Sequence, residues 1–504
     1  MTKNFSKRLS FLQTDQLWPL IILAGFLFFV SLVPLPPNDF WWHLKIGELI
    51  YNGKSIPTTN LFAWTLSPDA PFTYGAWLGE LLMYLFYKIG RLELVTFMRT
   101  LLAGITFWLV AYESWRKSGS WRLSALAVVL ACGMTINNLP TRPQIWSWVP
   151  FMIYLILLGK YVDRQINPRW LLVLPALMFF WVNAHGAFIL GGVMIGIFFV
   201  GEILRRLIFP RNSLNWKEIA YLGGSGVLTG FAMFINPRHI GIIGYVINLM
   251  TDQPSQKLIV EWQSPSPVGI ANTIFYVSIL ILIVGLIFTK NRLTFTEALL
   301  ILCFLWLAWS GQRYVVWYGL VCMPILTKVM GGLPLSLPQL SPQKNLLNLL
   351  IAIILFIPVF LVQPWFVERF PLPERYWKLV LRHSPAGPLV GVETPVEAVE
   401  FLREHPGGQL FNEMGYGSYL IWALPEQAVF IDPRVELYPF DQWQDYVHIT
   451  NGLHYNELLE KYGVNRLLID TELQLELTQV LDKDPAWKKE FQGIRSQIWV
   501  KTQP

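Results

Sequence analysis

Apolar runs long enough to cross a membrane constrain this fold more than any other feature of the chain. A helix needs about 20 mostly apolar residues to span the hydrocarbon core. Apolar runs without period-two alternation must be helices there, because only a helix satisfies its own backbone hydrogen bonds in lipid. Eleven runs approach this length, at residues 17–36, 92–113, 123–140, 145–162, 170–186, 187–209, 218–236, 271–289, 294–310, 313–330 and 346–364. We therefore expect an α-helical polytopic membrane protein of about eleven spans.

Composition supports this class and divides the chain in two. Of the 504 residues, 54% are hydrophobic and 14% charged, whereas soluble domains carry about 25% charged residues. Residues 1–364 hold 26 Lys and Arg against 13 Asp and Glu, while residues 365–504 hold 13 against 20. We expect a transmembrane domain at 1–364 and an extracytoplasmic α/β domain at 365–504. The positive charge belongs to cytoplasmic loops and does not indicate nucleic-acid binding.

Lys and Arg placement predicts the orientation, because cytoplasmic loops retain positive charge. With the N-terminus inside, the inner loops carry Arg116, Lys117, Arg122, Arg164, Arg169, Arg205, Arg206, Arg211, Lys217, Lys290, Arg292, Lys328 and Lys344. The outer turns carry few, mainly Arg142, Arg238, Lys257 and Arg313. This register requires that residues 75–90, interrupted by Glu80, form an interfacial helix on the outer surface. The first outer loop is then 37–91, in a multi-pass protein of the cytoplasmic (inner) membrane.

The start of that loop, P-L-P-P-N-D-F-W-W-H-L, places an acid among aromatic residues at a membrane edge. Carboxylates at such positions usually face a cavity or a substrate path. Asp39 and His43 are four residues apart, so one helical face presents both. Asp39 is a candidate general base or cation ligand, and its alternative role is helix capping. Glu80 is a candidate second carboxylate, or simply the polar face of an amphipathic helix.

Further polar residues fall on the predicted outer side. Arg142 in T-R-P-Q and Arg313 in S-G-Q-R-Y are candidate phosphate clamps, because a guanidinium donates two hydrogen bonds at once. A snorkelling interfacial Arg is the alternative for Arg142. His185 in W-V-N-A-H-G is a candidate substrate-binding group, or a residue that makes a packing hydrogen bond between two spans. His43 is another candidate, or an interfacial aromatic, and Glu261 in the outer loop after the span 218–236 is a third. The chain lacks a Gly-rich nucleotide loop, HExxH and GxSxG.

The tail alternates short strands and helices, which predicts a small α/β domain. Helices are expected at 395–405, 456–462 and 475–491, and strands at 409–411, 428–431, 466–470 and 497–501. The loops at 414–419 and 432–434 follow the first two strands, where such sheets bind ligands. Turn glycines and a surface Asp–Arg pair are the alternative interpretation.

These motifs resemble a family. The stretch from Asp39, D-F-W-W-H-L-K-I-G-E-L-I-Y-N-G-K-S-I-P-T-T-N, and W-L-G-E at Trp77 look like the first outer loop of GT-C class membrane glycosyltransferases. T-R-P-Q, W-V-N-A-H-G and the tail's G-Y-G-S-Y-L-I-W and F-I-D-P-R resemble a bacterial branch of that class. The resemblance implies polyprenyl-phosphate sugar donors, a catalytic Asp39 and an inverting transfer. Many members carry an adjacent acid pair, whereas Asn38 and Phe40 flank Asp39, so a divalent cation is left open.

The expected function is therefore transfer of a sugar from a polyprenyl-phosphate donor to a glycan, lipid or protein acceptor outside the membrane. Asp39 would deprotonate the acceptor, with Glu80 as a second acid, while Arg142 and Arg313 stabilise the departing phosphate. One alternative is a transporter or flippase of lipid-linked or amphipathic solutes. Another is a non-catalytic cell-envelope assembly protein.

Overall fold

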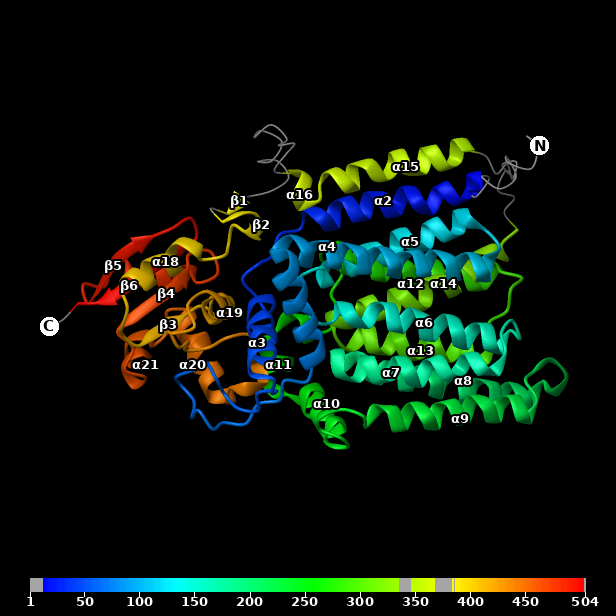
Figure 1. Ribbon diagram of the computed structural model, residues 1–504, viewed down its shortest axis with the longest axis horizontal. Coiled ribbons are helices and arrows are strands. Elements are labelled where there is room, and N and C mark those ends of the chain that lie inside the picture. Colours follow the sequence, from blue (N-terminus) through cyan, green and yellow to red (C-terminus); the bar gives the residue numbers. More distant parts are fainter. Residues whose placement is uncertain (1–11, 335–345, 368–382, 385, 503–504) are drawn as a thin grey trace.

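The computed structural model describes residues 12–334, 346–367, 383–384 and 386–502. Long helices lie side by side in a bundle, and a smaller domain of strands and short helices sits at one end of it (Figure 1). The orienting residue Lys344 and the first part of the tail, 368–382, lie outside the described residues.

Each of the eleven predicted runs coincides with a bundle helix. These are α2 (Leu17–Leu32), α4 (Trp77–Ser118), α5 (Trp121–Thr135), α6 (Ile145–Val162), α7 (Val173–Ala184), α8 (Ile189–Ile208), α9 (Trp216–Met233), α12 (Ile270–Phe288), α13 (Phe295–Ser310), α14 (Val315–Gly331) and α15 (Leu346–Leu361). Counting adjoining 3-10 turns, six helical segments among the described residues are long and apolar enough to cross a membrane, and three more there are shorter apolar helices. The helical membrane architecture is confirmed, and the number of crossings stays a prediction.

Polar residues mark where the bundle helices begin. Asn215 and Glu218 form a capping box at the start of α9, and Thr294 and Glu297 form another at α13. The Ser120 hydroxyl accepts from the Leu123 amide at the start of α5. The helix sides that face outward are apolar, including Phe231 on α9 and Ile287 on α12. A surface of this kind fits lipid rather than water.

The predicted interfacial segment 75–90 is the first part of α4. Gly90 and Arg91 leave helical geometry, and Arg91 has a φ of 52°, so the helix breaks there. Figure 1 shows α3 (Phe40–Gly53) and this first part of α4 across the bundle end that faces the smaller domain.

Two glycines allow close stacking at that end. A Cβ on Gly47 of α3 would lie 2.2 Å from the Glu80 carbonyl oxygen, and one on Gly79 would lie 2.4 Å from the Ala184 carbonyl oxygen. The three layers α3, α4 and the end of α7 therefore approach backbone to backbone.

The smaller domain carries a four-stranded sheet in the order β3-β4-β6-β5, with β3 parallel to β4 and the other pairs antiparallel. Its elements are β1 (His383–Ser384), β2 (Gly387–Gly391), α18 (Val396–Glu404), β3 (Leu410–Asn412), α19 (Met414–Ala423), α20 (Phe440–Thr450), α21 (Tyr455–Lys461), β4 (Arg466–Asp470), α22 (Leu475–Leu481), β5 (Trp487–Gln492) and β6 (Ser496–Lys501). The predicted α/β class of the tail is confirmed.

Three details of the tail prediction were wrong. The expected loop at 414–419 is helical, since it forms the first part of α19. The expected helix 475–491 ends at Leu481, and its last part is instead strand β5, which pairs with β6. The expected strand 428–431 is outside the sheet. Val429 forms an isolated bridge with Ala63 of the first loop, so its backbone hydrogen bonds are satisfied by a distant segment.

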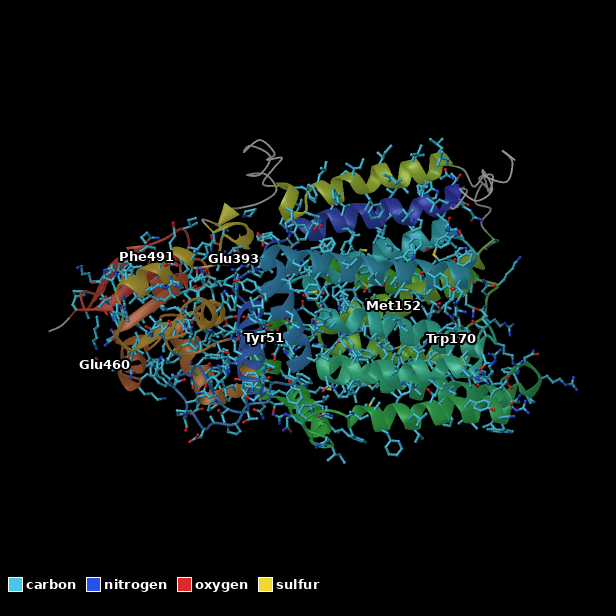
Figure 2. The ribbon with its side chains drawn as sticks, in the orientation of Figure 1. Tyr51, Met152, Trp170, Glu393, Glu460 and Phe491 are labelled. Atoms are coloured by element: carbon cyan, nitrogen blue, oxygen red, sulfur yellow. The ribbon has the colours of Figure 1, made fainter. Side chains whose placement is uncertain are left out.

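The first loop packs into the core of the C-terminal domain. Trp42, Ile46 and Tyr74 belong to the same buried apolar cluster as Phe411, Tyr416 and Trp443. Figure 2 shows Tyr51 of α3 beside this domain, Met152 within the bundle, Trp170 toward its far end, and Glu393, Glu460 and Phe491 in the C-terminal domain. The division at residue 364 stays a prediction, and the buried core of the C-terminal domain also includes residues of the first loop.

Helix α19, which carries the G-Y-G-S-Y-L motif, holds the segment that bears Asp39. The Ser418 hydroxyl accepts from the Trp42 amide at 3.1 Å and donates to the Asn38 carbonyl. A Cβ on Gly415 would lie 2.3 Å from the Pro37 carbonyl oxygen. Gly415 is thus required for close approach of α19 to the loop before Asp39.

We expect Gly415→Ala to lower the free energy of unfolding by about 1–3 kcal/mol, because the added methyl group has no room against Pro37. This loss would appear although Ala favours helices over Gly by up to about 1 kcal/mol. Gly230→Ala in α9 is the matched control, since nothing lies within 4 Å of its added Cβ. Denaturation of both purified variants in nanodiscs tests the difference; equal stability would contradict the proposed contact.

Candidate active site

A cavity of about 460 Å³ lies where the bundle meets the C-terminal domain. Its wall is built from the first loop, three helix-end turns, the α10 (Gly241–Thr251) and α11 (Gln253–Leu258) region, and the loop 433–436 of the C-terminal domain. Six of the predicted site residues line it: Asp39, His43, Arg142, His185, Glu261 and Arg313. The structure therefore brings together residues that lie far apart in the sequence.

Arg142 joins two carboxylates at this wall. Its Nε lies 2.7 Å from Oδ2 of Asp39, and its Nη1 donates to Oε2 of Glu261 at 2.7 Å. Asp39 precedes α3, Arg142 precedes α6, and Glu261 lies in the 3-10 turn Val260–Trp262. The three side chains are partly buried, so their attraction is screened less than that of a surface pair.

A second arginine fixes the segments that carry this triad. Buried Arg99 of α4 donates to the Val33 carbonyl at 2.6 Å and to the Thr141 hydroxyl at 3.3 Å. These bonds place the chain leading to Asp39 beside the turn that carries Arg142. The sequence did not mark Arg99, because a charged residue inside an apolar run has no recognisable motif around it.

The surroundings of Asp39 and Glu261 shift the pKa values of their carboxyl groups in opposite directions. Burial raises the pKa of Asp39 above its ordinary value, with Arg142 opposing and Glu261 adding to this rise. The pKa of Glu261 is lowered, because the attraction and hydrogen bond of Arg142 outweigh its burial. Asp39 is therefore the more basic of the two, and pairs of acids with separated pKa values commonly take different roles.

Glu80 lies behind the cavity wall rather than on it. It is 1% exposed, and its Oε1 is 2.7 Å from Nδ1 of His43. The His43 ring also lies against Trp42, with ring centroids 3.6 Å apart. Burial lowers the pKa of His43 below its ordinary value, while Glu80 partly offsets this. Glu80 thus orients His43, and the expected second carboxylate at the cavity wall is Glu261 instead.

His185 lines the cavity, and its hydrogen bonds determine which of its ring nitrogens carries the proton. The Ala187 amide donates to its Nδ1 at 3.2 Å, and the Ser147 hydroxyl lies 2.9 Å from the same atom. The Trp181 indole donates to the Ser147 oxygen, so the Ser147 proton is free to point at His185. Burial lowers the pKa of His185 to about 3, which favours the neutral ring. Because Nδ1 accepts from the Ala187 amide, the proton of the neutral ring is on Nε2. His185 can therefore donate a hydrogen bond to a bound anion.

Arg313 is the cavity cation without an ion pair among the described residues. Its guanidinium lies over the Trp262 ring, 4.2 Å from the centroid, at the start of α14. Cation–π contact holds the group while leaving its N–H donors available. Of the two predicted phosphate clamps, Arg313 is the one whose charge is uncommitted.

The C-terminal domain adds an acid that the sequence did not mark. Glu436 lines the cavity, and burial raises its pKa to about 7. Its loop is fixed by the fully buried pair of Asp432 and Arg434, whose atoms lie 2.6 Å apart, and Arg434 also donates to the Tyr74 hydroxyl. The predicted surface Asp–Arg pair is therefore buried and positions this wall. The F-I-D-P-R motif was the available signal for the loop.

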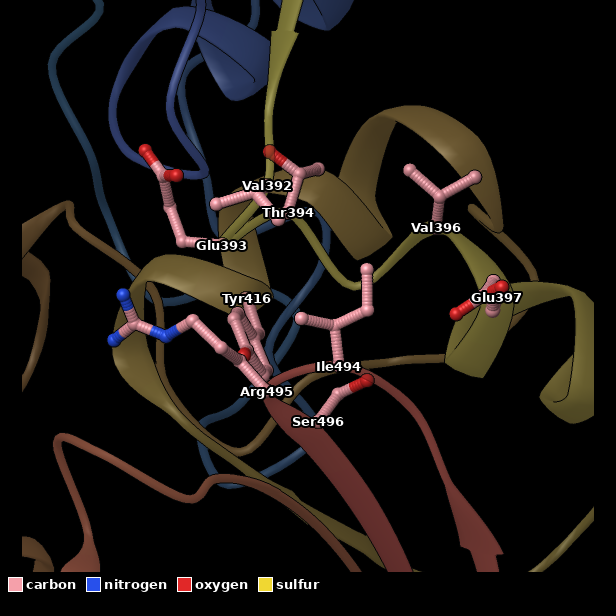
Figure 3. A pocket seen from close by; sticks show the side chains of 9 residues that line it. All are labelled: Val392, Glu393, Thr394, Val396, Glu397, Tyr416, Ile494, Arg495 and Ser496. Carbon is pink, nitrogen blue, oxygen red and sulfur yellow. The ribbon is translucent and has the colours of Figure 1, made fainter. Parts of the chain in front are cut away.

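Two other hollows are different in kind. One in the C-terminal domain holds about 10 Å³, room for one water, and Figure 3 shows its wall, which includes Tyr416 and Arg495. Both of these side chains already bind Asp470. Another, of about 170 Å³, lies between bundle helices and is lined by Arg116, Lys117, Arg205 and Lys328, four of the predicted inner-side cations. Their acidic partners include Glu113 and Glu297, so this cluster is largely neutralised.

Comparison with known proteins shows the fold. No protein-family model matches the chain, and no curated protein matches its sequence. The archaeal oligosaccharyltransferase AglB from Archaeoglobus fulgidus, solved with an inhibitory peptide and a dolichol-phosphate, aligns with a TM-score of 0.50 at 13% identity, over 97% of this chain and 74% of that chain. ArnT from Cupriavidus metallidurans, in the apo state, aligns with a TM-score of 0.50 at 13% identity, over 95% and 96%. The chain therefore has the fold of the GT-C membrane glycosyltransferases.

We expect Glu80→Gln to lower the pKa of His43 further, because the carboxylate is the group that favours the protonated ring. NMR titration of ¹⁵N-histidine-labelled protein in nanodiscs measures this, with the His43 signals assigned by His43→Gln. Glu48→Gln on the same helix is the control, since Glu48 pairs with Lys45 and should leave the His43 titration unchanged. An unchanged His43 pKa in Glu80→Gln would contradict the assigned contact.

Proposed function

We propose that this protein is a membrane glycosyltransferase that moves a sugar from a polyprenyl-phosphate donor to an acceptor on the outer face of the membrane. The observation that carries the proposal is the cavity at the bundle end, where Asp39, Arg142, His185 and Arg313 converge in a chain with the AglB and ArnT fold. The dolichol-phosphate in the AglB structure supports a lipid phosphate as the donor's leaving group. We place the N-terminus in the cytoplasm and the C-terminal domain outside the inner membrane.

In this reaction the acceptor oxygen attacks the anomeric carbon of the sugar. The bond from that carbon to the phosphate oxygen breaks, the lipid phosphate leaves with the electron pair, and the acceptor proton moves to Asp39. Oδ1 of Asp39 is the oxygen that takes the proton, because Oδ2 is held by Arg142 at 2.7 Å, whereas Oδ1 accepts a long hydrogen bond, 3.5 Å, from the Trp42 indole. A raised pKa suits this role, since a base near the working pH accepts a proton more effectively.

We propose that the donor phosphate binds at two other residues of the cavity lining, Arg313 and His185. Arg313 supplies a positive charge and several N–H donors, and Nε2–H of His185 supplies one more from a neutral ring. Donors fixed in place before the reaction stabilise the charge that develops on the leaving phosphate. The apolar residues Tyr245, Val246 and Leu249 of α10 line the same cavity and suit the first isoprene units of the lipid.

We expect Asp39→Asn to lower the transfer rate by about 10²–10⁴-fold, the contribution typical of a positioned general base. The assay incubates protein in nanodiscs with a panel of radiolabelled polyprenyl-phosphate sugars and follows sugar release or transfer. Asp69→Asn is the control, because Asp69 is an exposed acid of the same loop. Full activity in Asp39→Asn would refute the assignment. Saturable donor binding without turnover in the wild type would favour a transporter or an assembly protein.

We expect the acidic limb of the kcat/KM profile to shift to lower pH in Glu261→Gln. Asp39 acts as a base when deprotonated, so the rate rises with pH through its pKa, and the Glu261 charge raises that pKa. Removing the charge therefore lowers the pKa of Asp39 and moves the limb down. Glu48→Gln should leave the limb in place. A shift to higher pH in Glu261→Gln would contradict the assigned coupling.

A further inference from the structure

Asp39, Arg142 and Glu261 are arranged like a metal site in which two carboxylates share one cation, with the Arg142 guanidinium where the ion would lie. Two carboxylates from distant segments point at one positively charged group, each at 2.7 Å. A divalent cation that bridged the same carboxylates would lie about 2.0–2.6 Å from each oxygen. The guanidinium and the ion would therefore compete for the same position between Asp39 and Glu261.

Other donors near this position do not complete a cation site. Among the residues that the structure describes, no three His, Cys, Asp or Glu side chains group closely enough to hold a metal ion. Both histidines are engaged at Nδ1 only, His43 with Glu80 and His185 with the Ala187 amide, so it is their placement relative to the two carboxylates that leaves them out of such a group. The buried amide oxygen of Asn38 lacks a hydrogen-bond partner, but it carries no charge. Hard divalent cations need six or more oxygen ligands, or several waters beside the carboxylates.

Arg142 also remains charged and paired between Asp39 and Glu261. An arginine side chain stays protonated in proteins, and its two ion pairs here are formed in a partly buried environment. Removing one member of such a pair leaves an uncompensated charge, which is costly. Entry of a cation would require Arg142 to leave both carboxylates and find new partners for its charge.

We propose that the Arg142 guanidinium takes the place of a divalent cation at this site, so that the wild-type protein neither binds nor requires one there. The consequence for catalysis rests on the proposed function: Arg142 holds Asp39 in position and supplies the fixed positive charge beside the reacting atoms. Arg142 then acts on the acceptor side, and Arg313 is left to hold the donor phosphate.

Manganese binding tests this without any sugar donor, so its outcome is independent of whether transfer is found. Full-length protein in phosphatidylcholine nanodiscs is titrated with Mn²⁺ and followed by electron paramagnetic resonance. We expect no saturable site in the wild type. We expect Arg142→Ala to gain one Mn²⁺ site per chain, because the two carboxylates are then without a cation and water entering the space of the removed side chain can complete the coordination of the ion. That site should be lost in the Arg142→Ala, Asp39→Asn double variant.

Arg238→Ala is the matched control, a nearby arginine for which the structure shows no ion pair among the described residues, and it should behave as the wild type. Arg142→Lys keeps the charge and should not gain the site, which separates loss of charge from loss of folding. Stoichiometric Mn²⁺ binding by the wild type that Asp39→Asn removes would overturn the proposal. Absence of a gained site in a folded Arg142→Ala variant would overturn it as well.

Discussion

The packing of the first loop into the C-terminal domain is the constraint on which the site depends. Asp39 lies on a loop between two helices, and loops of that kind are usually mobile. Here the C-terminal domain holds that loop: the Ser418 hydroxyl bonds to the Trp42 amide, and Trp42 packs in the same apolar cluster as Tyr416. Gly415 allows this close approach because it has no side chain. The C-terminal domain therefore acts as a support for the bundle end as well as contributing Glu436 to the cavity wall. Fixing donors and bases in advance is what allows a polar cavity to stabilise a transition state.

The charges of the cavity are distributed so that each has a separate task. Arg142 is committed to Asp39 and Glu261, Arg434 is committed to Asp432, and Arg313 lies on an indole ring with its charge uncommitted. Glu80 and Arg99 act one layer deeper, through His43 and through Thr141. Among the residues that the structure describes, Arg313 is thus the cavity cation left for an anionic ligand.

Most of the helical architecture could be predicted from the sequence, because uninterrupted apolar runs have one stable form in lipid. The candidate residues were also identifiable, since Asp39, Arg142 and Arg313 are costly at a membrane edge. Their partners were not, because an ion pair such as Arg142–Glu261 depends on loops that meet only after folding. The expected helix over 475–491 followed from local preference, as Lys and Glu favour helices, whereas pairing of W-K-K-E-F-Q with β6 decided the outcome. Residues 428–431 were expected to join the sheet, because the sequence does not show that Val429 pairs instead with Ala63 in a distant segment.

The backbone stacking at Gly47 and Gly79 has a consequence for how such a site could diverge. Those two positions set the spacing between the layers that carry His43, Glu80 and His185. A larger residue at either position would push these layers apart and displace all three groups together. Changes in substrate size are therefore easier to accommodate in α10, whose Tyr245, Val246 and Leu249 line the cavity and take no part in this backbone stacking. In a set of related proteins, we would therefore look for the determinants of lipid and sugar length in α10, and we would expect Gly47 and Gly79 to be kept.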